Sequence, residues 1–203
     1  MVLKDSNEAR IEAARIVGLG GVIAFRTDTF YGLGADPLNA AAVQKIRDLK
    51  GREDNKPILL IISDPQQAKR FIKNPTPAFK SVADRFWPGP ITLVGYATSE
   101  LPAELTADSG TIGVRLPNDD DVRSLVRKCG GALTATSANT SGNAPARSAA
   151  EVDRYFSDGL DLILDGGEVT VTEPSTVVDL SGTAPRLIRE GAITREQLTE
   201  YLG

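Results

Sequence analysis

The sequence KGREDNKPILLII, residues 50–62, carries the two features from which the fold and the site can be predicted. Its second part, residues 58–62, is a continuous apolar run. Strands that are buried on both faces have such runs, so this part predicts a sheet with helices on both sides. Its first part sets three cations, Lys50, Arg52 and Lys56, within seven positions. They should lie on the loop that leaves the preceding helix.

The cation cluster has two explanations. Ala42, Ile46 and Leu49 have helical spacing and end at Gly51, and cations near a helix C-terminus often do no more than favour the negative end of its dipole. The other explanation is a site for a polyanion. On this stretch alone the helix-dipole explanation is slightly the stronger, and only distant stretches of the chain favour the anion site.

The composition restricts the classes of function. The chain has 203 residues, 41% of them hydrophobic and 25% charged, which predicts one globular domain over residues 1–203. A net charge of −4 argues against a generally basic nucleic-acid surface, so any polyanion site must be concentrated. We expect a cytoplasmic protein with no membrane partner, because no apolar run approaches the ~20 residues of a membrane helix and the N-terminus has no secretory signal.

The absence of histidine is the strongest negative fact in the composition. It removes the commonest general base, the commonest metal ligand and every Ser-His or Cys-His arrangement. The one cysteine, Cys129, allows neither an intramolecular disulfide nor a thiolate cluster. An enzyme with this composition must work by positioning and electrostatics, with carboxylates or lysine, or with a metal that its substrate brings.

Strand-like and helix-like segments alternate along the chain, which predicts an α/β fold. Helices should begin at Ser6, Asn39, Asp64, Thr76, one of residues 118–120, Ser148 and Thr194. Strands are expected at residues 22–25, 58–62, 91–97, 111–116, 132–136, 162–164, 175–180 and 186–189, with a loop over residues 98–110. Strand alternation would place Arg186 and Arg189 on opposite faces.

Two polar stretches follow predicted strands. Residues 27–34 (TDTFYGLG) combine hydroxyls, a carboxylate and two glycines, and open α/β sheets usually bind ligands at such a place. A plain turn in which Asp28 bonds its own backbone explains the stretch about equally well. Residues 136–142 (TSANTSG) could line a nucleotide pocket or form an ordinary polar loop. Composition alone does not decide between these readings.

Arg115 lies between Val114 and Leu116 in a short predicted strand. An arginine there is unfavourable unless it faces water or meets an anion, so it is a candidate functional residue, with a surface-facing strand arginine as the alternative. The chain has neither a GxxxxGK[ST] phosphate loop nor a GxGxxG turn after a strand. A nucleotide would have to be held in another way.

Taken in order, the stretches TDTFYGLG, KGR with KP, VRLP, TSAN, PSTVVD and IREG resemble the YrdC/TsaC family of L-threonylcarbamoyladenylate synthases. The resemblance runs from about Gly20 to Gly191. Lys50 and Arg52 with Ser137 and Asn139 are similar to the family's KxR...SxN signature. Longer members carry an additional C-terminal domain, so the length of this chain suggests the short form.

The resemblance implies a twisted mixed sheet of parallel and antiparallel strands, with helices around a concave cleft. It implies that L-threonine, bicarbonate and ATP react to give threonylcarbamoyl-AMP and pyrophosphate, for threonylcarbamoyladenosine at position 37 of tRNA. ATP would bring Mg²⁺, no protein-bound metal is expected, and a tRNA threonylcarbamoyl transferase complex would take the product. The implied residues are Lys50 and Arg52 as catalytic, Arg52, Lys56, Thr111, Ser137, Asn139 and Arg189 for ATP, and Thr29, Arg115 and Ser175 for threonine.

Three positions depart from the family pattern. Arg26 and Glu53 stand where proline is usual, which puts the shape of two loops in doubt. Ile61 stands where some members have a polar residue near threonine, which makes the threonine contacts less certain.

Two alternative functions stay open at this point. The first is a double-stranded-RNA-binding protein of the same fold, against which the acidic net charge and the 5% aromatic content count. The second is a carbamoyl-transfer module like the related domain of hydrogenase-maturation carbamoyltransferases. Those proteins carry zinc-finger-like and acylphosphatase parts, which are not found in these 203 residues.

Overall fold

A computed structural model describes residues 1–51, 58–107 and 109–202 of the chain. The strands in these residues are β1 (Val2–Lys4), β2 (Ile23–Arg26), β3 (Tyr31–Gly34), β4 (Leu59–Ile62), β5 (Ile91–Tyr96), β6 (Thr111–Arg115), β7 (Ala132–Ser137), β8 (Leu162–Asp165), β9 (Thr176–Asp179) and β10 (Arg186–Arg189). The helices are α1 (Asn7–Gly18), α2 (Ala40–Leu49), α3 (Ala68–Phe71), α4 (Pro77–Phe86), α5 (Ala103–Thr106), α6 (Asp120–Lys128), α7 (Ala149–Tyr155) and α8 (Thr199–Leu202), with 3₁₀ turns η1 (Pro65–Gln67) and η2 (Glu196–Leu198).

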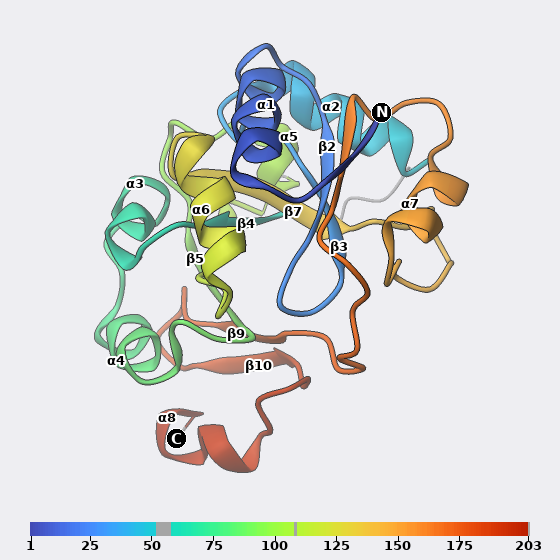
Figure 1. Ribbon diagram of the computed structural model, residues 1–203. Coiled ribbons are helices and arrows are strands. Elements are labelled where there is room, and N and C mark those ends of the chain that lie inside the picture. The colour runs from blue at the N-terminus through green and yellow to red at the C-terminus, as the bar shows by residue number, and fades with distance from the viewer. Residues whose placement is uncertain (52–57, 108, 203) are drawn as a thin grey trace.

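The strands form one mixed sheet in the order β1-β8-β2-β3-β7-β4-β6-β5-β9-β10. The pairs β1–β8, β2–β8, β4–β6 and β5–β9 are parallel, and the remaining neighbours are antiparallel. Figure 1 shows β9, β10 and α8 at the end of the molecule opposite α1 and α2. The predicted mixed α/β sheet is confirmed.

Both faces of the sheet are covered by helices. On one face α1 and α6 pack their apolar sides on Ile61, Leu133 and their neighbours. On the other face α2, α4 and α7 contribute to a larger cluster around Leu60 and Leu93. Successive residues of β4 face opposite clusters. Leu60 belongs to the larger cluster and Ile61 to the cluster under α1 and α6, and both are fully buried. The run ILLII is therefore apolar on both sides of the sheet, as the sequence predicted.

The local helix signals act as expected. Ser6, Asn39, Thr76 and Ser148 each accept a hydrogen bond from a backbone N–H in the first turn of the following helix. Trp87 is a packing residue, because its ring meets that of Phe79 edge to face at 5.9 Å and its indole N–H donates to the Ile91 carbonyl.

Two sequence predictions of local structure were wrong. Residues 98–110 are not all loop, because α5 forms within them and buries Leu105 and Thr106. Arg186 and Arg189 do not lie on opposite faces. Arg186 pairs with Asp179 and Arg189 with Val177, two positions apart on β9, because a β-bulge interrupts β10 between Leu187 and Arg189. The bulge inserts one residue and returns Arg189 to the face of Arg186.

None of the helices within the described ranges combines the length and apolar character that crossing a bilayer requires.

Candidate functional site

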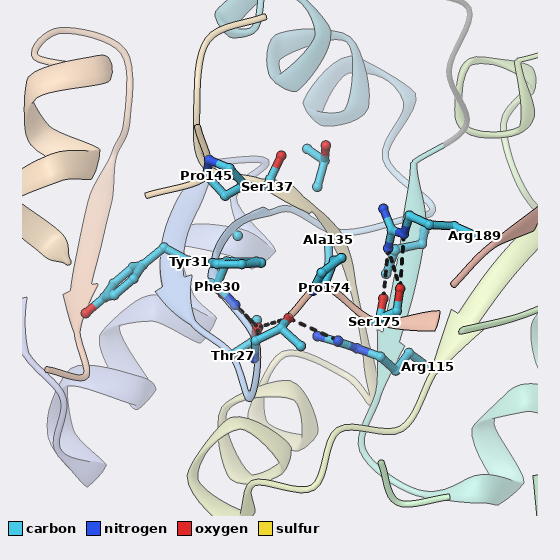
Figure 2. A pocket seen from close by; sticks show the side chains of 14 residues that line it. Thr27, Phe30, Tyr31, Arg115, Ala135, Ser137, Pro145, Pro174, Ser175 and Arg189 are labelled. Atoms are coloured by element: carbon cyan, nitrogen blue, oxygen red, sulfur yellow. Dashed lines mark hydrogen bonds between the residues drawn. The ribbon is translucent and has the colours of Figure 1, made fainter. Parts of the chain in front are cut away.

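A cavity of about 300 Å³ lies over the middle of the sheet. Segments that are distant in sequence line it, namely the β2–β3 turn, the ends of β6 and β7, and the segment before β9. The lining residues are Thr27, Thr29, Phe30, Tyr31, Gly32, Leu59, Arg115, Ala135, Thr136, Ser137, Pro145, Pro174, Ser175 and Arg189. Figure 2 shows the side chains of this cavity. Five of the predicted site residues line it, namely Thr29, Arg115, Ser137, Ser175 and Arg189.

The β2–β3 turn presents Thr29 to this cavity. The Thr27 hydroxyl accepts hydrogen bonds from the backbone N–H groups of Thr29 and Phe30 and donates to the Phe30 carbonyl at 2.7 Å. Thr27 is therefore the residue that closes the turn. The alternative in which Asp28 bonds its own backbone was wrong, since Asp28 Oδ2 accepts from the Asn118 N–H. The predicted ligand loop is also shorter than residues 27–34, since Tyr31–Gly34 forms β3.

Arg115 projects from the end of β6 and is only 4% exposed, so the surface-facing alternative is excluded. Its Nη1 donates to the Thr29 hydroxyl at 3.1 Å, and its Nη2 lies 3.1 Å from Asp28 Oδ1. Among the described residues its Nε has no hydrogen-bond partner. Burial lowers the pKa of Arg115, and the carboxylate of Asp28 acts in the opposite direction. A buried guanidinium with an open donor is a site for an anionic acceptor.

Ser175 and Arg189 form the opposite side of the cavity. Arg189 donates from Nε and Nη2 to the Ser175 carbonyl, at 3.1 and 2.7 Å, and from Nη2 to the Ser175 hydroxyl at 3.1 Å. Partial desolvation lowers the pKa of Arg189, and the charge of Arg115 lowers it further. The two guanidinium groups repel each other, and together they make the cavity locally positive in a chain whose net charge is −4.

Gly191, in the IREG stretch, permits this arrangement. A Cβ at this position would lie 2.2 Å from the Pro174 carbonyl oxygen and 2.9 Å from the Ser175 carbonyl carbon. Only glycine allows the chain after β10 to pass so close to the segment that carries Ser175.

Tyr31 supports the cavity wall without taking part in proton transfer near neutral pH. Its hydroxyl donates to the Gly167 carbonyl at 2.8 Å and accepts from the Gly166 N–H, and in Figure 2 its ring points away from the other labelled side chains. Burial, together with the charge of Asp165, raises the pKa of Tyr31 to about 12. The phenol is therefore neutral at physiological pH.

Lys50 ends α2 and is 1% exposed. Its ammonium donates to the carbonyls of Ser137 and, at 2.9 Å, Asn139. The Ser141 N–H in turn donates to the Lys50 carbonyl. The structure thus brings together Lys50, Ser137 and Asn139, as their resemblance to the KxR...SxN signature implied. Lys50 fixes the end of β7, whose last residue, Ser137, lines the cavity.

Asn139 and Thr111 do not line the cavity. Asn139 Nδ2 donates to the carbonyls of Thr140 and Asn143, and its Oδ1 is buried with no hydrogen-bond partner within the described ranges. Thr111 begins β6, four residues before Arg115, and its hydroxyl lies 2.9 Å from that of Ser109. Strand periodicity puts Thr111 on the face of Arg115 but at the other end of the strand. Roles for both in ATP binding stay predictions.

The remaining predicted residues differ in outcome. Arg52, Lys56 and the departure Glu53 lie outside the described residues. Arg26 forms an ion pair with Asp119 at 2.8 Å and so connects the end of β2 to the start of α6. Ile61 is fully buried under α1 and α6 and does not line the cavity, so this departure from the family pattern leaves the cavity wall unchanged.

Sequence reasoning missed the apolar wall of the cavity and the counter-ion of Arg115. Phe30, Leu59 and Pro174 line the cavity, although only their neighbours had been singled out. A signal for Asp28 was present, since a buried arginine requires a nearby carboxylate and Asp28 lies within the TDT stretch. Across the ranges 1–51, 58–107 and 109–202, no group of three acidic, histidine or cysteine side chains could hold a metal ion.

The sequence model of the Sua5_yciO_yrdC family, described as "Telomere recombination", matches residues 15–191. The chain belongs to this family. Among curated members, a threonylcarbamoyl-AMP synthase of Thiobacillus denitrificans is 41% identical over 162 residues, which are 80% of this chain and 86% of that protein. One of Pyrococcus abyssi is 35% identical over 191 residues, 94% of this chain and 56% of that protein.

A solved structure agrees with this family assignment. The P. abyssi Sua5 protein complexed with L-threonine superposes with a TM-score of 0.95 at 32% identity, covering 100% of this chain and 61% of that one. The chain thus spans little more than half the length of its P. abyssi relative.

Proposed function

We propose that this chain is an L-threonylcarbamoyl-AMP synthase, which forms threonylcarbamoyl-AMP and pyrophosphate from L-threonine, bicarbonate and ATP. The observation that carries the proposal is the cavity itself. It sets the buried guanidinium of Arg115, whose Nε has no hydrogen-bond partner among the described residues, beside the short hydroxyls of Thr29 and Ser175. Two relatives named threonylcarbamoyl-AMP synthase support the proposal, and so does the structure of P. abyssi Sua5 complexed with L-threonine.

The cavity suits an α-amino acid with a short polar side chain. The planar guanidinium of Arg115 matches a carboxylate in geometry and charge. The Thr29 oxygen accepts from Arg115, and its proton goes to the Thr27 oxygen 3.1 Å away, because the Thr27 hydroxyl donates to the Phe30 carbonyl. The remaining lone pair of Thr29 is left to accept from a ligand donor. A volume of about 300 Å³ is at the low end for small-molecule sites. We expect Thr29, Arg115 and Ser175 to bind threonine and Arg189 to contact the ATP beside it.

The reaction demands little proton transfer from the protein after the carbamate has formed. The threonine amine and bicarbonate give the carbamate and water. A carbamate oxygen then attacks the α-phosphorus of ATP, the bond to the β-phosphate oxygen breaks, and pyrophosphate leaves. Two anions meet in this step, so catalysis consists mainly of charge neutralisation and alignment. Arginine and lysine side chains, with the Mg²⁺ that ATP brings, can supply both without histidine.

Two further parts of the proposal concern the nucleotide and the recipient of the product. Lys50, Arg52, Lys56, Thr111, Ser137 and Asn139 would hold the nucleotide or neutralise its charge. The product would pass to a tRNA threonylcarbamoyl transferase complex. The relatives' names support this activity and lend no support to the RNA-binding alternative.

The test is pyrophosphate release from Mg-ATP, with L-threonine and bicarbonate omitted in turn. Release should require both. Release that ignores threonine would contradict the proposal and favour a carbamoyl-transfer activity. Binding of double-stranded RNA is measured in parallel at several salt concentrations. If Lys50 contacted RNA phosphates, its replacement would reduce the slope of log K against log salt by about one.

A further inference from the structure

Arg115 has a carboxylate partner that does not line the cavity. Asp28 Oδ1 lies 3.1 Å from Arg115 Nη2, and the Asp28 side chain is 11% exposed. The other carboxylate oxygen accepts a hydrogen bond from the Asn118 N–H at 3.2 Å. Asp28 is thus held between the β2–β3 turn and the segment after β6, and it contacts Arg115 from outside the set of cavity-lining residues.

The contacts of Arg115 determine which of its donors is available. Nη1 is occupied by the Thr29 hydroxyl, and Nη2 lies beside Asp28. Nε has no partner among the residues that the structure describes, although it is fully buried. Nη2 is at ion-pair distance from Asp28 Oδ1 without a hydrogen bond to it, and these contacts at both Nη atoms restrict how the guanidinium can turn. The N–H groups that they leave, on Nε and on the two Nη atoms, are the donors available to a ligand.

We propose that Asp28 is a positioning residue, which orients Arg115 so that its guanidinium receives the carboxylate of the amino-acid substrate. This inference rests on the proposed function. Since Asp28 does not line the cavity, it neither touches the substrate nor accepts a proton from the substrate amine. Its anchorage to the Asn118 N–H also prevents it from turning into the cavity, where its negative charge would repel the substrate.

Charge gives the second reason for the assignment. A buried guanidinium requires a counter-charge, and breaking such a pair leaves an uncompensated ion that draws water or moves. Asp28 supplies this counter-charge when the cavity holds no substrate. Because Asp28 is not among the residues that line the cavity, the substrate carboxylate can bind Arg115 without displacing Asp28.

A neighbouring ion pair provides a matched control. Arg26 and Asp119, 2.8 Å apart, also connect the β2–β3 hairpin to the segment after β6, and neither contacts Arg115 in any recorded hydrogen bond or ion pair. If Asp28 only joined these segments, replacing Arg26 should weaken threonine binding as much as replacing Asp28. If Asp28 positions Arg115, only the replacement of Asp28 should weaken it.

The experiment measures the binding of L-threonine and of ATP by calorimetry, with the melting temperature of every variant. Asp28→Asn keeps the shape and the acceptor for the Asn118 N–H but removes the charge. It should weaken L-threonine binding by about tenfold or more and ATP binding by less than about twofold. Arg26→Gln should leave both affinities within about twofold. Asp28→Glu, which keeps the charge, should recover part of the lost affinity.

A double-mutant cycle with Arg115→Gln tests whether Asp28 acts through Arg115. Once Arg115 is replaced, Asp28→Asn should cause no further loss of threonine affinity. Unchanged threonine binding by Asp28→Asn, additive losses, or equal losses in Asp28→Asn and Arg26→Gln would each overturn the inference alone. Failure of the unmodified chain to bind L-threonine would overturn the proposed function and this inference with it.

Discussion

Replacing Lys50 by methionine tests the contact that joins α2 to the TSAN loop. The substitution keeps most of the aliphatic volume and removes an ammonium that donates to the Ser137 and Asn139 carbonyls. Each hydrogen bond from a charged donor contributes about 1.5–3 kcal/mol, and of the two carbonyls Ser137 keeps a second donor, the Asn139 N–H. Burying the charged ammonium away from water costs a few kcal/mol in the unmodified chain. The variant avoids this cost, which offsets part of the loss. We therefore expect a net loss of about 2 kcal/mol in the free energy of unfolding.

For a chain of this size, about 2 kcal/mol lowers the melting temperature by about 4–8 °C. Typical stabilities of about 5–15 kcal/mol leave the variant folded at 25 °C, so pyrophosphate release can be measured on it. Release should fall strongly, because the end of β7, which carries Ser137 into the cavity, loses its anchor. The assays are thermal unfolding by circular dichroism and pyrophosphate release under identical conditions.

Lys45→Met is the matched control on the same helix. The Lys45 ammonium donates to the Gly20 carbonyl at 3.0 Å, remote from the cavity, and the residue is exposed. Its replacement should change stability by less than about 1 kcal/mol. Equal melting temperatures for the two variants would refute the reasoning on stability. Full pyrophosphate release by Lys50→Met would show that Lys50 only anchors the loop and is not catalytic.

Two other predictions concern backbone approach and pH. Gly191→Ala should lower both the melting temperature and the affinity for L-threonine, because the added Cβ would lie 2.2 Å from the Pro174 carbonyl oxygen. Gly182→Ala is the control and should change neither, because its Cβ would lie 3.9 Å from the nearest atom, the Ala184 carbonyl oxygen. Because the pKa of Tyr31 is raised to about 12 in the folded chain, the neutral phenol stabilises the fold below about pH 10, and this contribution is lost as pH rises to 12. Tyr31→Phe should flatten the fall of melting temperature over that interval and remove the phenolate absorbance gained near pH 12. A fall as steep as in the unmodified chain would contradict this assignment.

The sequence by itself determined the fold class and most of the secondary structure, although it did not indicate β3 or α5. Hydrogen bonds within a few residues fix helix starts such as those at Ser6 and Asn39, so their signals are local. The run ILLII gave a two-sided sheet because burial on both faces requires apolar residues at every position. The order of six short stretches was specific enough to indicate the family, although none of them alone was.

Only the tertiary structure decided what the polar residues of those stretches contact. Asp28 and Arg115 are 87 positions apart, and no periodicity in the sequence pairs them. Their ion pair exists because the β2–β3 turn lies against the end of β6. The bulge in β10 likewise depends on its pairing with β9, and it reversed the predicted face of Arg189. Strand order and register join distant residues, and these are properties of the assembled sheet that no local window of the sequence contains.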